Sequence, residues 1–178
     1  MKMLKKLLAV VLTGAMALTL LTACGGNAVT EKDIADAMND MAKATEVNVT
    51  FTPQAKEREM AKAIAALSDE DLKELEESLK NSSLPEKAKE ILGINAGGAN
   101  ANNFVWCGAT YTDELGTSGQ ALNFMTQVMD KSANADKLRG KNPADDRYMG
   151  TALYKTVDEN GKQVTKRIIV VTAEAVDE

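Results

Sequence analysis

Gln163 to Ala173 reads Gln-Val-Thr-Lys-Arg-Ile-Ile-Val-Val-Thr-Ala, and the centre of this stretch, Ile168–Val171, is an uninterrupted aliphatic run. β-Branched residues of this kind favour a strand. Successive side chains of a strand point to opposite faces of its sheet, so an unbroken apolar run needs cover on both faces. The run therefore predicts a central strand with a layer of structure on each side.

A second strand is predicted at Tyr148–Val157, joined to the first by Asp158-Glu159-Asn160-Gly161. A glycine at this position can adopt a positive φ, so the segment predicts a β-hairpin turn. The segment also echoes part of a calcium-binding loop, but the sequence lacks the alternating oxygen ligands and the distal glutamate of an EF-hand. We interpret it as a turn only.

The chain from residue 30 to about residue 93 shows helical patterning. Thr30 predicts an N-cap for a helix over Glu31–Ala44, and the alternating segment Glu46–Thr52 predicts a short extended piece. Thr52-Pro53 predicts the N-cap and first residue of a second helix, because proline favours that position. Ser68 predicts the cap of a third helix, and Pro85 the start of a short fourth.

The rest of the chain mixes loops with a strand and a helix. Asn95–Asn103 is typical of a loop, Phe104–Tyr111 of a strand, and Gly116–Gly119 of the turn before a helix. The polar segment Ser132–Arg147 predicts a long loop, a kind of segment that often carries function. We expect an α+β fold, an α-β-α sandwich with a small, mainly antiparallel sheet and a helical N-terminal half.

The N-terminus has the pattern of an export signal. Lys2, Lys5 and Lys6 precede the apolar run Leu7–Leu21, which is too short for a spanning helix of about 20 residues. Leu21-Thr22-Ala23-Cys24 resembles the lipobox of bacterial lipoproteins, in which the cysteine thiol is acylated. The resemblance implies a signal peptide over 1–23, a tether over 24–29 and one α+β domain over 30–178. It also implies a palmitate-bearing lipid anchor on Cys24 at the extracytoplasmic face of the cell membrane.

The composition excludes several classes of function. The chain has no histidine, which excludes Ser-His-Asp and Cys-His nucleophile pairs and His-ligated zinc. Without residues 1–23 the chain carries 18 basic and 26 acidic residues, a net charge of −8 over 155 residues. This acidic balance argues against nucleic acid as a partner. Acylation of Cys24 would leave Cys107 as the only thiol, so an intramolecular disulfide is not expected.

The order of the predicted elements resembles that of the CAP domain, the family of cysteine-rich secretory, antigen 5 and pathogenesis-related proteins, over residues 30 to 173. Asn39 followed by Val47–Pro53 looks like the family's helix and extended segment, and Ser132 onward to Tyr148–Ala152 is similar to its serine-to-strand stretch. Gly108–Tyr111 lacks the family's glutamate and asparagine, and both family histidines are missing. The resemblance implies an αβα sandwich and carries over no catalytic, cofactor or metal residue.

Each candidate site residue has an alternative interpretation. Trp106 and Tyr111 are the large side chains most suited to line a cleft beside the long loop, although the core also needs aromatic residues. Asp145 and Asp146 could bind a cation or act as paired carboxylates, but adjacent residues point apart. We interpret Cys107 as a core residue. The charge runs Lys56–Arg58 and Asp69–Glu77 are interpreted as solvated helix faces.

The leading functional hypothesis is a lipid-anchored extracytoplasmic module without catalysis, which binds a small molecule or a protein. One alternative is a cell-envelope hydrolase that uses carboxylates or a Ser/Lys pair; convergent side chains of these types would favour it. Another is an inhibitor or accessory subunit of a second exported protein, which would present a large apolar patch. The sequence points to no cofactor, and it leaves open the question of catalysis.

Overall fold

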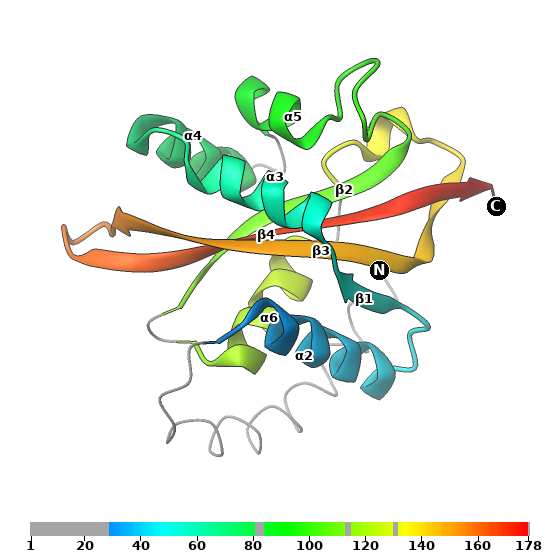
Figure 1. The fold of residues 1–178 in the computed structure, drawn as a ribbon, viewed down its shortest axis with the longest axis horizontal. Coiled ribbons are helices and arrows are strands. Elements are labelled where there is room, and N and C mark those ends of the chain that lie inside the picture. The colour runs from blue at the N-terminus through cyan, green and yellow to red at the C-terminus, as the bar shows by residue number, and fades with distance from the viewer. Residues whose placement is uncertain (1–28, 81–83, 113–114, 130–131, 178) are drawn as a thin grey trace.

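The structure is a computed structural model that describes residues 29–80, 84–112, 115–129 and 132–177 (Figure 1). Five α-helices, one short 3-10 helix and a four-stranded sheet make up the described part. In chain order they are α2 (Glu31–Ala44), β1 (Thr50–Pro53), α3 (Ala55–Ala65), α4 (Asp69–Lys80), α5 (Glu86–Leu92), β2 (Asn103–Tyr111), α6 (Thr117–Gln127), η1 (Ala135–Lys137), β3 (Lys141–Val157) and β4 (Gln163–Asp177).

The sheet has the strand order β1-β3-β4-β2. β1 runs parallel to β3, whereas β3 and β2 are both antiparallel to β4. The prediction of a central strand is confirmed, because β4 has a neighbour on each side and the side chains of Ile168 and Ile169 are both fully buried.

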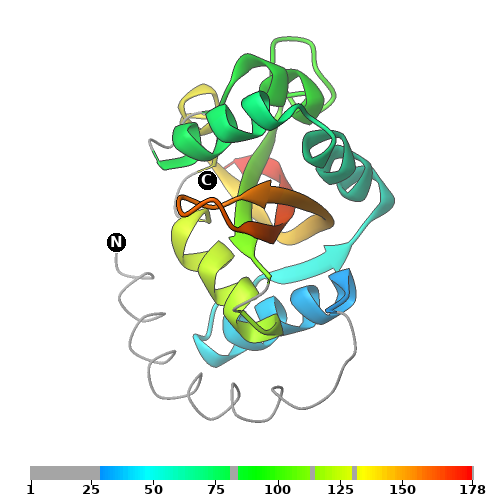
Figure 2. The same cartoon turned by 90° about the vertical axis from the view of Figure 1, so that its left-hand side faces the viewer.

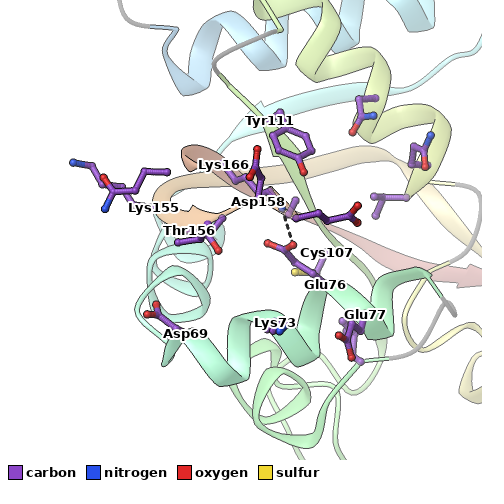
Figure 3. Close-up of a pocket in the computed structure, with 18 of the residues that line it drawn as sticks. Asp69, Lys73, Glu76, Glu77, Cys107, Tyr111, Lys155, Thr156, Asp158 and Lys166 are labelled. Carbon is purple, nitrogen blue, oxygen red and sulfur yellow. Dashed lines mark hydrogen bonds and ion pairs between the residues drawn. The ribbon is translucent and has the colours of Figure 1, made fainter. Parts of the chain in front are cut away.

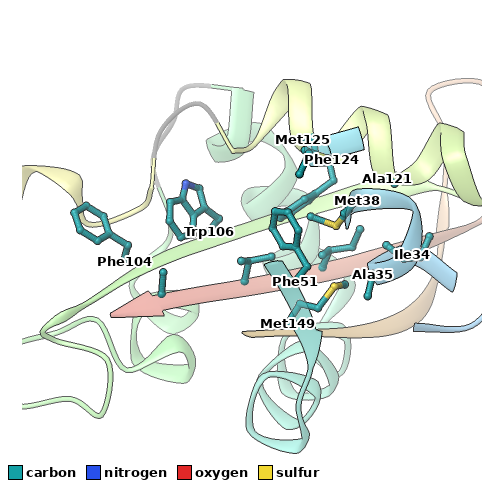
Figure 4. Packing of buried hydrophobic residues seen from close by; sticks show 14 of the residues in the cluster. Ile34, Ala35, Met38, Phe51, Phe104, Trp106, Ala121, Phe124, Met125 and Met149 are labelled. Atoms are coloured by element: carbon teal, nitrogen blue, oxygen red, sulfur yellow. The ribbon is translucent and has the colours of Figure 1, made fainter. Parts of the chain in front are cut away.

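Helices cover both faces of the sheet (Figure 2), and a hydrophobic cluster fills the space between helices and sheet on each face. The α2/α6 cluster joins Ile169 and Val171 of β4 to side chains such as Met38 and Phe124 (Figure 4). The α3/α4/α5 cluster lies on the opposite face and contains Ile168. The fold is therefore α+β, an α-β-α sandwich with a small sheet, as the sequence predicts.

Local capping signals place the helix ends. Thr30 and Asp33 form a capping box at the start of α2: the Asp33 amide donates to Thr30 Oγ1, and the Thr30 amide donates to Asp33 Oδ2 over 2.8 Å. Ser68 Oγ accepts from the Asp71 amide at the start of α4. Pro85 precedes α5, and Gly93 ends it with φ +65°. These predictions are confirmed.

Two boundaries differ from the prediction. Pro53 is the last residue of β1 rather than the first of a helix, and Gln54 is the N-cap of α3. β1 is an edge strand, where the missing N–H of proline is tolerated. β3 begins at Lys141, so the predicted long loop ends much earlier than Arg147. A register shift between Pro143 and Arg147 lets this polar segment continue the pairing with β4.

Asparagine side chains bind part of the outer edge of β1 and part of the outer edge of β2. The Asn39 amide donates to the carbonyl of Phe51 and accepts from its N–H on the outer side of β1. Asn134 accepts from the N–H of Val105 and donates to the carbonyl of Asn103 on the outer side of β2. Each amide therefore satisfies edge groups that would otherwise be open to another strand.

The charge run Lys56–Arg58 is not a solvated face, which corrects the prediction. Glu57 is 2% exposed and accepts a hydrogen bond from Thr172 Oγ1, so it lies between α3 and the sheet. Arg58 Nη2 forms an ion pair with Glu31 over 2.6 Å. The second Glu31 oxygen accepts from the Thr151 amide over 2.7 Å, just beyond the end of the β1 pairing. The run therefore joins α2, α3 and β3.

Candidate functional site

A pocket of about 1010 Å³ opens at the hairpin end of the sheet (Figure 3). α4 forms one wall, the last two turns of α6 form another, and the β3–β4 hairpin closes the third side. β2 contributes Cys107, Ala109 and Tyr111 between the two helices. The pocket is therefore built from four elements that are distant in sequence.

A partly buried ion pair lies on the hairpin side of the pocket. Lys166 Nζ is 2.6 Å from Glu76 Oε2, and the two side chains are 9% and 26% exposed. Tyr154 donates its hydroxyl proton to Glu76 Oε1 over 2.6 Å. The Lys166 ammonium also lies 4.5 Å from the centroid of the Tyr111 ring, within the range of a cation–π interaction. β2, β3, β4 and α4 thus meet in one polar network.

Burial raises the pKa of Tyr154 above its usual range, and the hydrogen bond to the Glu76 carboxylate adds to this effect. A phenol that donates to a carboxylate resists losing its proton, because the phenolate would face a second negative charge. Both Glu76 oxygens are held, one by a phenol and one by an ammonium. The network thus fixes α4 to the sheet and sets the shape of the pocket.

The pocket rim combines negative charge with exposed apolar side chains. Its lining includes five carboxylate and three lysine side chains, a formal net charge of −2. Tyr111 is 40% exposed and Val157 is 58% exposed. Large apolar side chains left in water beside a concave polar surface are typical of a binding site.

Cys107 lies on the pocket wall as a packed, buried thiol. Burial raises its pKa from 9.0 to about 12, so the thiol keeps its proton at neutral pH. It also belongs to the α3/α4/α5 cluster. The interpretation of Cys107 as a core residue is confirmed.

Among the four predicted cleft residues, only Tyr111 lines this pocket. Trp106 belongs to the α2/α6 cluster on the other face of the sheet, where its ring stacks on Phe104 with centroids 6.0 Å apart. The Arg147 guanidinium lies 4.9 Å from the Trp106 ring centroid. Trp106 and Tyr111 are an odd number of residues apart on β2, and this spacing places them on opposite faces.

Asp145 and Asp146 lie in strand β3, which corrects their expected position in a loop. Both are exposed, and Asp145 Oδ2 accepts a hydrogen bond from Asn48 over 2.9 Å. They are at the opposite end of β3 from the hairpin that borders the pocket. The structure therefore does not bring them together with Tyr111.

Glu76 and Lys166 are not among the site residues that the sequence predicts. Glu76 belongs to the run Asp69–Glu77. Most charged side chains of this run are exposed, as its interpretation as a solvated face predicts, but Glu76 departs from it because it is partly buried in this network. The strand pattern indicates that Lys166 is buried, because its side chain lies on the same face of β4 as those of Val164 and Ile168, which are both buried. A lysine in such a position needs a counter-charge. The sequence could not show that α4 supplies it.

Cys24, the predicted lipid-attachment site, is outside the described residues, and the CAP resemblance stays a prediction.

No helix in the described part of the chain has the length and apolar character that a membrane crossing requires. Within that part, no group of three or more Cys, Asp or Glu side chains is placed to hold a metal ion. The chain matches no protein-family model, no curated protein and no solved structure.

Proposed function

We propose that the chain is a lipid-anchored binding module of the extracytoplasmic membrane face, and that its ligand occupies the pocket between α4, α6, β2 and the β3–β4 hairpin. The observation that carries the proposal is the combination of a large pocket with a rigid polar wall. Lys166 and Glu76 are fixed by each other, while Tyr111 and Val157 are left exposed at the rim. Preorganised polar groups beside exposed apolar ones favour binding.

Binding is favoured over hydrolysis by the state of the pocket's polar groups. The Lys166 ammonium lies against a carboxylate rather than against a serine hydroxyl, and both Glu76 oxygens already accept hydrogen bonds. A general base needs an accessible lone pair, and a Ser/Lys nucleophile needs the two groups in contact. The arrangement supports a recognition surface in which Lys166 and Glu76 are already paired with each other.

A ligand screen tests the pocket. Chemical shifts of the purified chain are recorded with sets of sugars, nucleotides, amino acids and short peptides. We expect at least one class to shift resonances of Tyr111 and Lys166, and Ala109→Trp, which fills the pocket between the two helices, to abolish the shifts. Lys141→Ala, an exposed change at the far end of β3, serves as the matched control and should leave them unchanged. Turnover of an ester or amide substrate that Glu76→Gln abolishes would instead favour the hydrolase.

A second experiment tests the anchor. Cells that express the chain take up labelled palmitate, and membrane and soluble fractions are separated. We expect Cys24→Ala to lose the label and the membrane association, because two acyl chains supply the anchoring energy. Cys107→Ala is the matched control, since Cys107 is the only other cysteine. Label retained in Cys24→Ala would contradict the anchor.

A further inference from the structure

The outer edge of β2 has a defined set of outward-pointing backbone groups. The Thr112 amide donates to Thr165 on the β4 side, and the Val105 amide donates to Asn134 on the opposite side. Backbone groups of a strand alternate in direction, so the odd-numbered residues of β2 point away from β4. Cys107, Ala109 and Tyr111 therefore present their N–H and C=O groups along the outer edge.

Within the described part of the chain, hydrogen-bond partners cover only the first half of this edge. Asn134 and the Ala133 amide satisfy the outward groups of Asn103 and Val105. Beyond that point, no backbone hydrogen bond joins the outward groups of Cys107, Ala109 or Tyr111 to another described residue. The same three residues line the pocket. The pocket thus encloses a stretch of sheet edge whose outward backbone groups have no backbone partner among the described residues.

We propose that the ligand is an extended, basic peptide segment that adds a strand to the edge of β2 between α4 and α6. The proposal rests on the proposed function and names the ligand class. An exposed sheet edge supplies backbone hydrogen bonds, and the flanking surfaces select side chains. The carboxylates of the lining outnumber its lysines by five to three, which favours a basic segment.

The flanking side chains fit this geometry. The side chains of β2 alternate, so Cys107, Ala109 and Tyr111 point to the α4 side, where Asp69, Glu76 and Glu77 carry the negative charge and Lys73 opposes it. Gly108 points the other way, and its lack of a Cβ lets Val128 at the end of α6 close against the strand. Alternate side chains of an added strand would face acidic α4 and the polar α6 side, which carries Asn123 and Gln127.

The probe is a short acetylated and amidated peptide in which lysine alternates with valine, added to the purified full chain. Amide hydrogen exchange is measured by NMR for Ala109 and Tyr111. We expect exchange at both amides to slow by about tenfold or more at saturation, because their N–H groups gain acceptors. The same peptide with N-methylated valines, or with glutamate in place of lysine, should bind about tenfold or more weakly.

A pair of variants tests the backbone contact from the protein side. Ala109→Pro removes an outward N–H that takes no part in the β4 ladder, whereas Ala109→Val keeps it. We expect affinity for the lysine–valine peptide to fall about tenfold in Ala109→Pro, and less than about threefold in Ala109→Val. The melting midpoint reports whether the proline variant is folded. If it is not, the N-methylated peptide decides the question on the unchanged protein.

Three results would overturn the inference. They are equal binding of the N-methylated peptide, unprotected Ala109 and Tyr111 amides in the bound state, or no binding of the basic peptide. If a small molecule still shifts Tyr111 and Lys166 in the third case, the binding module stands and only the peptide class falls. If no ligand class shifts the pocket resonances, the proposed function falls as well.

Discussion

Gly150 of β3 lies directly against the backbone of Arg58 in α3: a Cβ atom at residue 150 would clash with the Arg58 nitrogen and with the carbonyl carbon of Glu57. The first turn of α3 thus packs on the sheet without an intervening side chain. This close approach positions Glu57 against Thr172 and Arg58 against Glu31. The absence of a side chain at Gly150 therefore allows the close backbone contact between α3 and β3.

Gly150→Ala should be severely destabilising, because the obstructing atoms belong to a helix backbone and cannot rotate away. We expect a loss of about 3 kcal/mol or more in the free energy of unfolding, measured by urea denaturation. Gly119→Ala is the matched control: its Cβ would meet only the flexible Leu115 side chain at 3.2 Å, inside a helix that favours alanine. The control should change stability by about 1 kcal/mol or less. Equal effects of the two substitutions would contradict the packing argument.

The features predicted correctly are those that short stretches determine. Thr30 with Asp33, Ser68 with Asp71, and the hairpin turn at Gly161 each depend on residues within four positions of one another. Capping and turn chemistry act at this range. The sequence therefore contains the whole signal for these boundaries.

The features predicted wrongly depend on partners far along the chain. Asn142 and Pro143 have low strand propensity, yet they belong to β3 because β4 continues to Asp177 and pairs with them. Asp145 follows in the register shift between Pro143 and Arg147. Lys166 and Arg167 stand in the middle of an apolar strand. Their partners are a glutamate of α4 for the lysine and polar groups of α6, β3 and the segment before α2 for the arginine. These partners are distant in sequence, so no local pattern identifies them. The same limit applies to the predicted cleft, of which only Tyr111 lines the observed pocket.

The two faces of β4 give a paired test of the sandwich. Ile168 packs in the α3/α4/α5 cluster and Ile169 in the α2/α6 cluster, and both are fully buried. Ile168→Asp and Ile169→Asp should each cost about 4 kcal/mol or more, because each buries an unpaired charge. Val176→Asp, on the same strand but 42% exposed, should cost about 0.5 kcal/mol or less. Urea midpoints that show either isoleucine substitution to be tolerated would contradict the three-layer arrangement.

Cys107 should make stability fall at alkaline pH. Its pKa is about 12 in the folded chain because burial disfavours the thiolate, against an ordinary value of 9.0. As the pH rises, the unfolded chain therefore releases this proton before the folded chain does. The contribution of the Cys107 thiol to the free energy of unfolding is complete below about pH 9 and is lost as the pH rises toward 12. Over that range the free energy of unfolding should fall faster than in Cys107→Ala, by about 1.4 kcal/mol per pH unit at most. Parallel curves for the two proteins would contradict the effect.

The Glu76 network gives a spectroscopic test of the site. Burial, and then the bond to Glu76, raises the pKa of Tyr154. Glu76→Gln keeps an acceptor for the hydroxyl but removes the charge that opposes the phenolate, so the pKa of Tyr154 should fall while burial keeps it above the ordinary value. The chain has three tyrosines, and absorbance near 295 nm follows their ionisation, so one of the three transitions should move to lower pH.

Lys166→Met separates the ion pair from the phenol contact in the same network. It removes the ammonium from Glu76 Oε2 and leaves a partly buried carboxylate with only the Tyr154 hydroxyl. We expect a loss of about 3 kcal/mol in the free energy of unfolding, and a smaller loss when Glu76→Leu is added, because the second change removes the uncompensated charge. Lys155→Met, an exposed lysine on the same pocket rim, is the matched control and should change stability by about 0.5 kcal/mol or less. Additive losses in the double variant would show that Lys166 and Glu76 do not interact in solution. The rigid wall of the pocket would then depend on Tyr154 and the surrounding apolar contacts alone.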